Sequence, residues 1–236
     1  MLNSCGARPT PSPAAGQDTR QAEAHDGAAK VRHRARHRSS GGTAEAGKFD
    51  FYVLSLSWSP GFCATAAGRN DPLQCGPGRR FAFVLHGLWP QYQQGGWPEN
   101  CSTETADPSL IDSLLPIMPS AELVAHEWQK HGTCSGLSPK DYFEEAADAF
   151  HSIHVPPQYQ APLRQITVSP DQLHQDFVTA NPKMGDQGIV VLCTRNGRYL
   201  EEVRFCLTQD LEGRPCNAEV LRDACRSDRV TMRPVS

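Results

Sequence analysis

The segment from 126 to 134, His-Glu-Trp-Gln-Lys-His-Gly-Thr-Cys, gathers four ionisable side chains. They are His126, Glu127, Lys130 and His131. On a helix that advances about 100° per residue, these four fall within an arc of about 140°. Val124 and Trp128 take the opposite side, where they can pack inward. A helix face with four such groups and no apolar residue between them is either a solvated surface or an active site.

A second histidine segment, His86-Gly87-Leu88-Trp89-Pro90, follows the apolar run at 81–85. We expect 81–85 to be a short strand that stops at His86 and Gly87, so that a rigid element presents His86 to an open loop. A tryptophan in such a loop can stack on a nucleic-acid base. The alternative is that His86 is a hydrogen-bonded structural histidine and Trp89 belongs to the core.

A zinc site is one interpretation of the helical segment, because His126-Glu127 begins like the metalloprotease motif His-Glu-x-x-His. That motif needs its second histidine at position 130, where this chain has a lysine whose positive charge repels a metal ion. His131 lies a further ~100° around the helix, which is poor geometry for a shared ligand. We therefore predict no metal and no cofactor.

Cleavage of RNA by its own 2′-hydroxyl group uses two histidines, a lysine and a glutamate without a metal. A base removes the 2′ proton, an acid protonates the departing 5′ oxygen, and a cation stabilises the charged phosphorane. Imidazole can do both proton transfers because its pKa lies near working pH. DNA lacks the 2′-hydroxyl group and would not be a substrate.

Four segments of the chain resemble the ribonuclease T2 family. HGLWP at 86–90 and HEWQKHGTC at 126–134 look like its two active-site segments, SWSPGFC at 57–63 looks like its first strand and loop, and YLEEVRFC at 199–206 looks like its late strand. The resemblance covers roughly residues 49–228. It implies an α+β fold, with a central antiparallel sheet flanked by helices and stapled by disulfides.

The resemblance also implies roles for the site residues. His131 would be the general base and His86 the general acid, while Glu127 and Lys130 would polarise the phosphate and stabilise the transition state. His126 would help to bind phosphate. The family forms a 2′,3′-cyclic phosphate from single-stranded RNA and then opens it to a 3′-phosphate, without a metal and commonly under mildly acidic conditions.

The base-binding residues are less well defined by the sequence. Some family members follow HGLWP with an acidic residue that helps to read the base, whereas this chain has Gln91. Trp89 remains for stacking, and Tyr92 or Trp97 could add a second aromatic wall; the alternative is that they pack within the loop. Because stacking tolerates any base, we expect low base specificity.

Eight of the nine cysteines lie in residues 49–236, and Cys5 stands apart. An even set without a Cys-x-x-Cys pair indicates four disulfides and an oxidising, secreted or periplasmic location, although eight buried free thiols are the alternative. The family resemblance implies the pairs Cys63–Cys75, Cys101–Cys134, Cys193–Cys225 and Cys206–Cys216. Residues 1–10 show no complete signal peptide, but Leu2-Asn3-Ser4-Cys5 resembles the end of a lipoprotein signal, so Cys5 is a candidate lipid anchor.

Hydrophobic patterning predicts the elements that must position these residues. We expect strands at 49–58, 81–85, 189–193 and 199–206, the last two joined by a tight turn at Asn196-Gly197. Ser59-Pro60-Gly61 should end the first strand. We expect helices from a Ser120 cap to Lys130, from Ser138-Pro139 onward, and from Pro170 to about Asn181.

Composition divides the chain into two parts. Residues 1–47 are rich in Ala, Pro, Ser, Gly and Arg, a composition that predicts a disordered tail or tether. This tail contains a basic run at 31–38, which either contacts a polyanion or is a solvated linker. For residues 48–236 we predict a single catalytic domain. Residues 49–236 carry 15 basic and 22 acidic side chains, which disfavours a general nucleic-acid scaffold.

No apolar run is long enough for a membrane span, and mean hydropathy is −0.49. We expect a monomeric enzyme that acts on single-stranded RNA. Two other classes remain as alternatives: a non-catalytic relative that kept the fold as a binding module, and a zinc hydrolase.

Overall fold

The computed structural model describes residues 44–235. Cys5 and the basic run at 31–38 lie outside the described residues, as does most of the predicted tail. At the border of that tail, the backbone N–H of Gly47 donates to the carbonyl oxygen of Cys134 at 2.9 Å.

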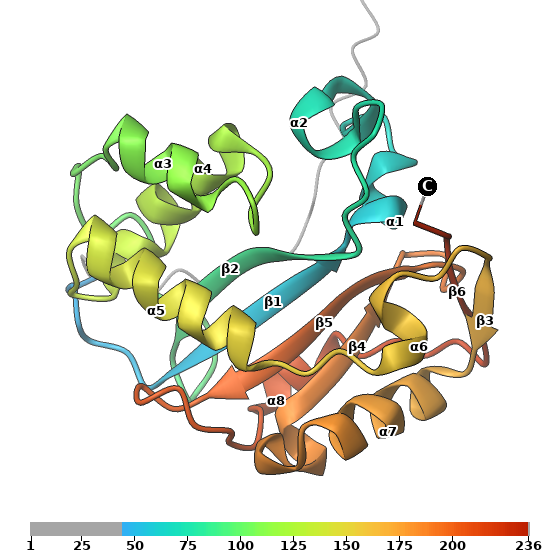
Figure 1. Cartoon of the computed structure of the whole chain (residues 1–236). Coiled ribbons are helices and arrows are strands. Elements are labelled where there is room, and N and C mark those ends of the chain that lie inside the picture. The colour runs from blue at the N-terminus through green and yellow to red at the C-terminus, as the bar shows by residue number, and fades with distance from the viewer. Residues whose placement is uncertain (1–43, 236) are drawn as a thin grey trace, which may run out of the picture. The chain divides into compact units, whose positions relative to one another are not determined.

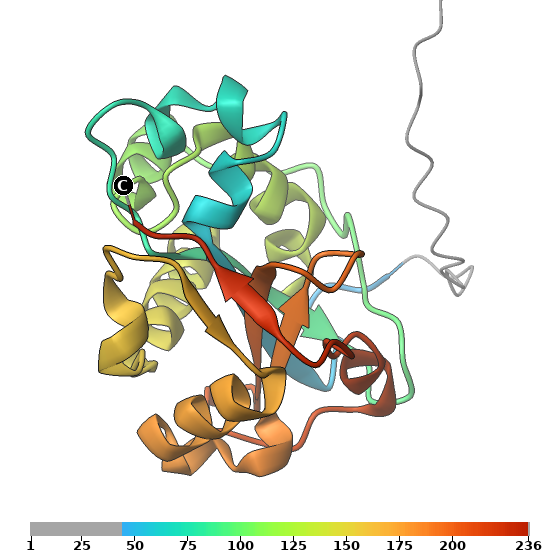
Figure 2. The same ribbon diagram turned by 90° about the vertical axis from the view of Figure 1, so that its right-hand side faces the viewer.

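The centre of the fold is a four-stranded antiparallel sheet in the order β2-β1-β5-β4 (Figure 1). Its strands are β1 (Phe51–Trp58), β2 (Phe83–Gln91), β4 (Ile189–Cys193) and β5 (Leu200–Leu207). A separate two-stranded sheet pairs β3 (Ile166–Val168) with β6 (Val230–Met232), and Figure 2 shows these two strands side by side. Antiparallel pairing with helices that are not interleaved as βαβ units makes the fold α+β, as predicted.

The helices fall at or near the predicted positions where a local signal marks them. Ser120, Ser138 and Ser169 each accept a backbone N–H at a helix start. They begin α4 (Ala121–Lys130), α5 (Pro139–Ser152) and α7 (Pro170–Ala180). The sequence did not predict the shorter helices α2 (Pro72–Cys75), α3 (Pro108–Leu114), α6 (Pro157–Gln160) and α8 (Ala218–Arg222), nor the 3-10 turns at Gly68–Asn70, Gly132–Cys134, Pro182–Met184 and Asp186–Gly188.

One of the two predicted strand ends was wrong and the other was confirmed. The second strand does not stop at His86 but runs to Gln91, because β2 stays paired with β1 on both sides of a register shift. Pro90 is tolerated there because β2 is an edge strand. Ser59-Pro60-Gly61 ends the first strand as predicted, since β1 stops at Trp58. The same residues start the short helix α1 (Ser59–Cys63), with Pro60 at a position where a missing N–H costs nothing.

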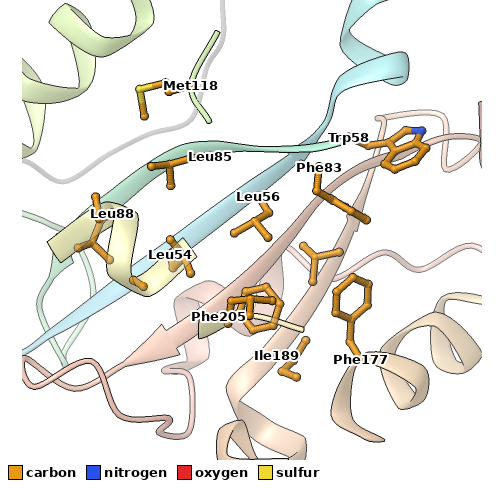
Figure 3. Close-up of a cluster of buried hydrophobic side chains, with 14 of the residues drawn as sticks. Leu54, Leu56, Trp58, Phe83, Leu85, Leu88, Met118, Phe177, Ile189 and Phe205 are labelled. Atoms are coloured by element: carbon orange, nitrogen blue, oxygen red, sulfur yellow. The ribbon is translucent and has the colours of Figure 1, made fainter. Parts of the chain in front are cut away.

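One face of the sheet carries the main hydrophobic core. Alternate residues of β1 point into it, and Figure 3 shows two of them, Leu54 and Leu56, among Leu85 and Phe205 from the neighbouring strands. Val124 and Trp128 of α4 join the same core and are 0 % and 1 % exposed. These two helix residues fix α4 against the sheet, as the sequence predicted.

The opposite face of the sheet has an apolar half and a polar half, one after the other along the strands. Phe51 and Val53 of β1 pack in a second apolar cluster that includes Val220 of α8. Two and four residues further along β1, the same face carries Ser55 and Ser57. The polar half of this face therefore lies next to the strand segment that contains His86.

The described residues contain four disulfides: Cys63–Cys75, Cys101–Cys134, Cys193–Cys225 and Cys206–Cys216. These are the pairs that the family resemblance implied. Among residues 44–235, none of the helices has the length and apolar character that crossing a membrane requires.

Candidate active site

A β-bulge in β2 places His86. Ser55 of β1 pairs with Gly87 and Leu56 pairs with Leu85, so His86 is the extra residue between two paired positions. Leu85 and Leu88 lie three apart and yet both enter the main core. The bulge makes this possible and leaves His86 on the polar half of the other face, which is a common use of bulges beside functional sites.

His86 is held from two sides. Its Nδ1 atom donates to Oε1 of Glu202 at 2.5 Å and lies 3.3 Å from the Ser57 hydroxyl oxygen. Its Nε2 atom lies 3.8 Å from Oε1 of Glu127 on α4. The side chain remains about one-third exposed (32 %), so solvent or a substrate can reach the ring.

The end of α4 brings the second histidine. Trp128 points into the core, whereas Glu127 and His131 point toward β2 and are 2 % and 6 % exposed. His131 is the C-terminal cap, and its backbone N–H donates to the carbonyl oxygen of Glu127. His126 is exposed and Lys130 half-buried. The four predicted residues thus form a partly buried group rather than a solvated helix face.

Trp89 lies between the two histidines. Its ring centroid is 5.2 Å from that of His86 and 5.5 Å from that of His131. Its indole N–H donates to Oε2 of Glu127 at 2.6 Å. Gly87 lies beside this hydrogen bond, and a Cβ atom there would overlap both the indole nitrogen and the Glu127 carboxylate. Trp89 therefore connects the two histidine segments through Glu127.

His86 and Glu202 form a charged pair. Burial opposes a positive charge on His86, but the hydrogen bond and the charge of Glu202 outweigh it, so the pKa of His86 lies above its ordinary value. Burial alone would raise the pKa of Glu202, but His86 and Arg204 hold it at about 2. His86 is therefore the histidine that carries a proton at mildly acidic pH.

His131 has the opposite character. Burial, followed by the positive charges of Lys130, His126 and His86, lowers the pKa of His131 to about 3. Its Nδ1 atom is buried without a hydrogen-bond partner among residues 44–235, so the ring reaches the site through Nε2. A neutral imidazole with one accessible nitrogen is suited to accept a proton.

The two remaining helix residues are also perturbed. Burial raises the pKa of Glu127, although His86, Trp89 and Lys130 act against it. Burial, Lys130 and His86 lower the pKa of His126. Burial is the first cause of both shifts, and in each case it disfavours the charged form of the side chain.

The segment 100–104 attaches the catalytic end of α4 to the chain after β2. Trp128 and Gln129 donate through their side chains to the carbonyl oxygens of Glu104 and Ser102, each at 2.7 Å. The backbone N–H of Asn100 donates to the carbonyl oxygen of Lys130 at 3.0 Å. The disulfide Cys101–Cys134 links the same segment covalently to the residues that follow α4. Rigid attachment of this kind keeps His131 in one place.

The candidate base-binding residues lie around the end of β2. Gln91 is buried and its amide nitrogen donates to the Pro90 carbonyl oxygen at 3.0 Å. Tyr92 is half-buried, and its carbonyl oxygen accepts from the side chain of Asn217 at 3.1 Å. The half-buried Trp97 donates its indole N–H to Glu99 at 3.3 Å.

Sequence reasoning missed two residues of this site, Glu202 and Arg204. They lie two apart on β5, so they share the face that carries His86. Arg204 forms an ion pair with Glu202 at 2.8 Å and lies 5.0 Å from the Trp89 ring centroid. The available signal was two charged residues at alternate positions of a strand whose intervening residues include the apolar Val203 and Phe205.

The fold and the site together define an α+β enzyme with internal disulfides and two histidines whose pKa values are shifted in opposite directions. Within the part of the chain that the structure describes, no group of three or more His, Cys, Asp or Glu side chains could hold a metal ion.

Comparison with known proteins agrees with this class. Residues 49–216 match the ribonuclease T2 family. A ribonuclease from Aeromonas hydrophila is 39% identical over 170 residues, which are 70% of this chain and 75% of that protein. This chain therefore belongs to the ribonuclease T2 family and is an endoribonuclease.

Solved structures show the same fold at low sequence identity. The RNase-related protein from Calystegia sepium superposes with a TM-score of 0.65 at 21% identity, covering 80% of this chain and 98% of that one. Trichomaglin, described as an S-like ribonuclease, gives a TM-score of 0.63 at 20% identity, covering 80% and 100%.

Proposed function

We propose that this enzyme cleaves single-stranded RNA without a metal ion, through attack of the ribose 2′-hydroxyl on the adjacent phosphate. The product of this step is a 2′,3′-cyclic phosphate, which water then opens to a 3′-phosphate. The observation that carries the proposal is the pair of histidines on either side of Trp89, whose pKa values are shifted in opposite directions.

Each histidine has the protonation state that its role requires in the first step. Neutral His131 takes the 2′ proton as the O2′–P bond forms. Protonated His86 gives its Nε2 proton to the departing 5′ oxygen as the P–O5′ bond breaks. In the second step water replaces the leaving group, so the two histidines exchange roles.

The phosphate would lie among Glu127, Lys130 and His126. The Lys130 cation already lowers the pKa of both His126 and His131, so its field reaches the reacting groups. A phosphate bound there would lie in this positive field, and the Lys130 cation would stabilise the phosphorane as its negative charge grows. Glu127, which accepts from the Trp89 indole N–H and faces Nε2 of His86, would help to polarise the phosphate.

Low base specificity is part of the proposal. Gln91 has no acidic group, and its amide is engaged by the Pro90 carbonyl oxygen. Trp89, with Tyr92 and Trp97 on the following turn, would contact a base through ring faces, which tolerate any base. We further propose that the enzyme works in an oxidising compartment, secreted or periplasmic, because four disulfides persist only where thiols are not kept reduced.

The test is a digestion of RNA at mildly acidic pH with excess EDTA, with analysis of the new ends. We expect 2′,3′-cyclic phosphate ends that appear despite the chelator. His86→Ala and His131→Ala should each lower kcat by at least about 100-fold, because each removes one proton transfer. His151→Ala, which changes an exposed histidine on α5, should leave kcat unchanged.

Other outcomes contradict the proposal in different ways. Cleavage that EDTA stops would indicate a metal-dependent reaction. No cleavage by the folded, oxidised protein at any pH would indicate a non-catalytic relative that binds RNA or another partner. Near-normal kcat in either catalytic-histidine variant would disprove the two-histidine mechanism.

A further inference from the structure

Glu202 is a buried carboxylate whose two oxygen atoms face two different charged partners, and Oε1 also accepts from the Ser57 hydroxyl at 3.5 Å. It is only 6 % exposed. Oε1 accepts from Nδ1 of His86 at 2.5 Å, and Oε2 accepts from Nε and Nη2 of Arg204 at 2.9 Å and 2.8 Å. A carboxylate that only balanced the charge of Arg204 would not need to accept a hydrogen bond from His86 at its other oxygen.

The protein holds this carboxylate in place before any substrate binds. Glu202 pairs with Ser57 in the register of β5 and β1, so the sheet sets its position beside His86. Arg204 is itself fixed on two further sides, by Asp223 at 3.1 Å and by the Trp89 ring. A chain of contacts therefore runs from Asp223 through Arg204 and Glu202 to His86.

This contact determines which nitrogen of His86 can react. Nδ1 is occupied by Glu202, so Nε2 is the atom left to exchange a proton. Nε2 is also the atom that faces Glu127 on the catalytic helix, at 3.8 Å. A carboxylate on one imidazole nitrogen commonly fixes both the tautomer and the ring orientation.

We propose that Glu202 is a positioning residue for the acid step: it keeps the Nδ1 proton on His86 and aims Nε2 at the departing 5′ oxygen. The inference deepens the proposed function and rests on His86 being the general acid. When the P–O5′ bond breaks, the Nε2 proton moves to O5′. The Nδ1 proton stays in its hydrogen bond to Glu202, so the carboxylate stays ionised throughout.

Charged groups face His86 from two elements besides its own strand. They are the ionisable groups Glu202 and Arg204 on β5, and His126, Glu127 and His131 at α4. Glu201 is the adjacent residue of β5, and its exposed side chain is on the other face of the strand. Of the groups that act on the pKa of His86, Glu202 raises it most, Glu127 adds to this, and Arg204 opposes it. Removing the charge of Glu202 should therefore make His86 lose its proton at lower pH.

The experiment measures kcat and KM against pH on a dinucleotide for the full chain and for Glu202→Gln. We expect the alkaline limb of kcat/KM to move to lower pH by about one pH unit. At the optimum kcat should fall by about 10- to 100-fold, as for other partners that orient a reactive histidine, with little change in KM. Glu202→Asp, which keeps the charge, should return the alkaline limb toward its original position.

Glu201→Gln is the matched control, because it removes the same charge from the adjacent, exposed position of β5. It should leave both kcat and the alkaline limb almost unchanged. A merely structural role of Glu202 would lower the melting temperature and reduce kcat equally at every pH, without moving the limb. That result would overturn the inference.

A second measurement needs no variant. The ¹⁵N chemical shifts of His86 in the full chain, recorded above its pKa, report which nitrogen holds the remaining proton. We expect the proton on Nδ1; a proton on Nε2 would contradict the positioning role even if Glu202→Gln failed to fold. If His86→Ala kept full activity, the proposed function itself would be wrong. A normal Glu202→Gln profile beside an inactive His86→Ala would reject only the role of Glu202.

Discussion

At the scale of single residues, two identical side chains have opposite surroundings, which suit the proposed acid and base roles. His86 has a buried carboxylate at 2.5 Å, whereas His131 has burial and three neighbouring cations. The first environment favours the imidazolium and the second disfavours it. Histidine suits both roles because its ordinary pKa already lies near neutral pH, so its surroundings can favour either protonation state.

These opposite shifts predict the pH dependence of kcat/KM. The proposed mechanism requires neutral His131 and protonated His86. The acid limb should therefore lie near pH 3, where His131 gains its proton, and the alkaline limb above 6.5, the ordinary value of a histidine. Initial rates on a dinucleotide across the pH range measure both limbs, because kcat/KM reports the free enzyme.

The same profile should be recorded for His151→Ala, whose limbs should coincide with those of the unaltered chain. Circular dichroism at each pH separates loss of activity from unfolding. An alkaline limb below 6.5 would mean that Glu202 does not hold the proton on His86. An acid limb close to pH 6.5 would mean that burial and the neighbouring positive charges do not lower the pKa of His131 in solution.

At the scale of elements, the bulge in β2 is what turns a regular edge strand into part of the site. Gly87 follows the extra residue and has no Cβ atom, which leaves room for the hydrogen bond between Trp89 and Glu127. Gly87→Ala would push a methyl group into both partners. We expect kcat to fall by about 100-fold, because small displacements of aligned catalytic groups cost that much.

Gly185→Ala is a suitable control for this variant. Gly185 has φ of +68° and open space around it, so alanine there strains the backbone away from the site. It should lower the melting temperature and leave kcat unchanged. Gly87→Ala with unaltered kcat would show that the Trp89–Glu127 hydrogen bond is not needed for catalysis.

The contrast between α4 and β2 explains what the sequence could predict. The position of α4 follows from local signals, namely the Ser120 cap and the inward pair Val124 and Trp128. The bulge in β2 depends on how β1 pairs with it, which no local pattern records. Glu202 was missed for the same reason, since it lies 116 residues from His86 in the chain.

At the scale of the whole molecule, disulfides connect parts of the chain that the sheet alone does not join. Cys101–Cys134 ties the segment after β2 to the end of α4, and therefore the strand that carries His86 to the helix end that carries His131. Cys193–Cys225 ties the end of β4 to the segment after α8. The two bridges span 33 and 32 residues, so chain entropy alone gives them nearly equal stabilising effects.

Because the two bridges close loops of nearly equal length, removing each in turn can separate an effect on stability from an effect on catalysis. Cys101→Ala/Cys134→Ala and Cys193→Ala/Cys225→Ala should each lower the free energy of unfolding by about 2–5 kcal/mol, measured by urea denaturation. Only the first variant should also lower kcat at a temperature where both are folded, because only it loosens the relative position of the two histidines. Equal kcat in the two variants would mean that the backbone and side-chain hydrogen bonds of segment 100–104 hold α4 without the bridge.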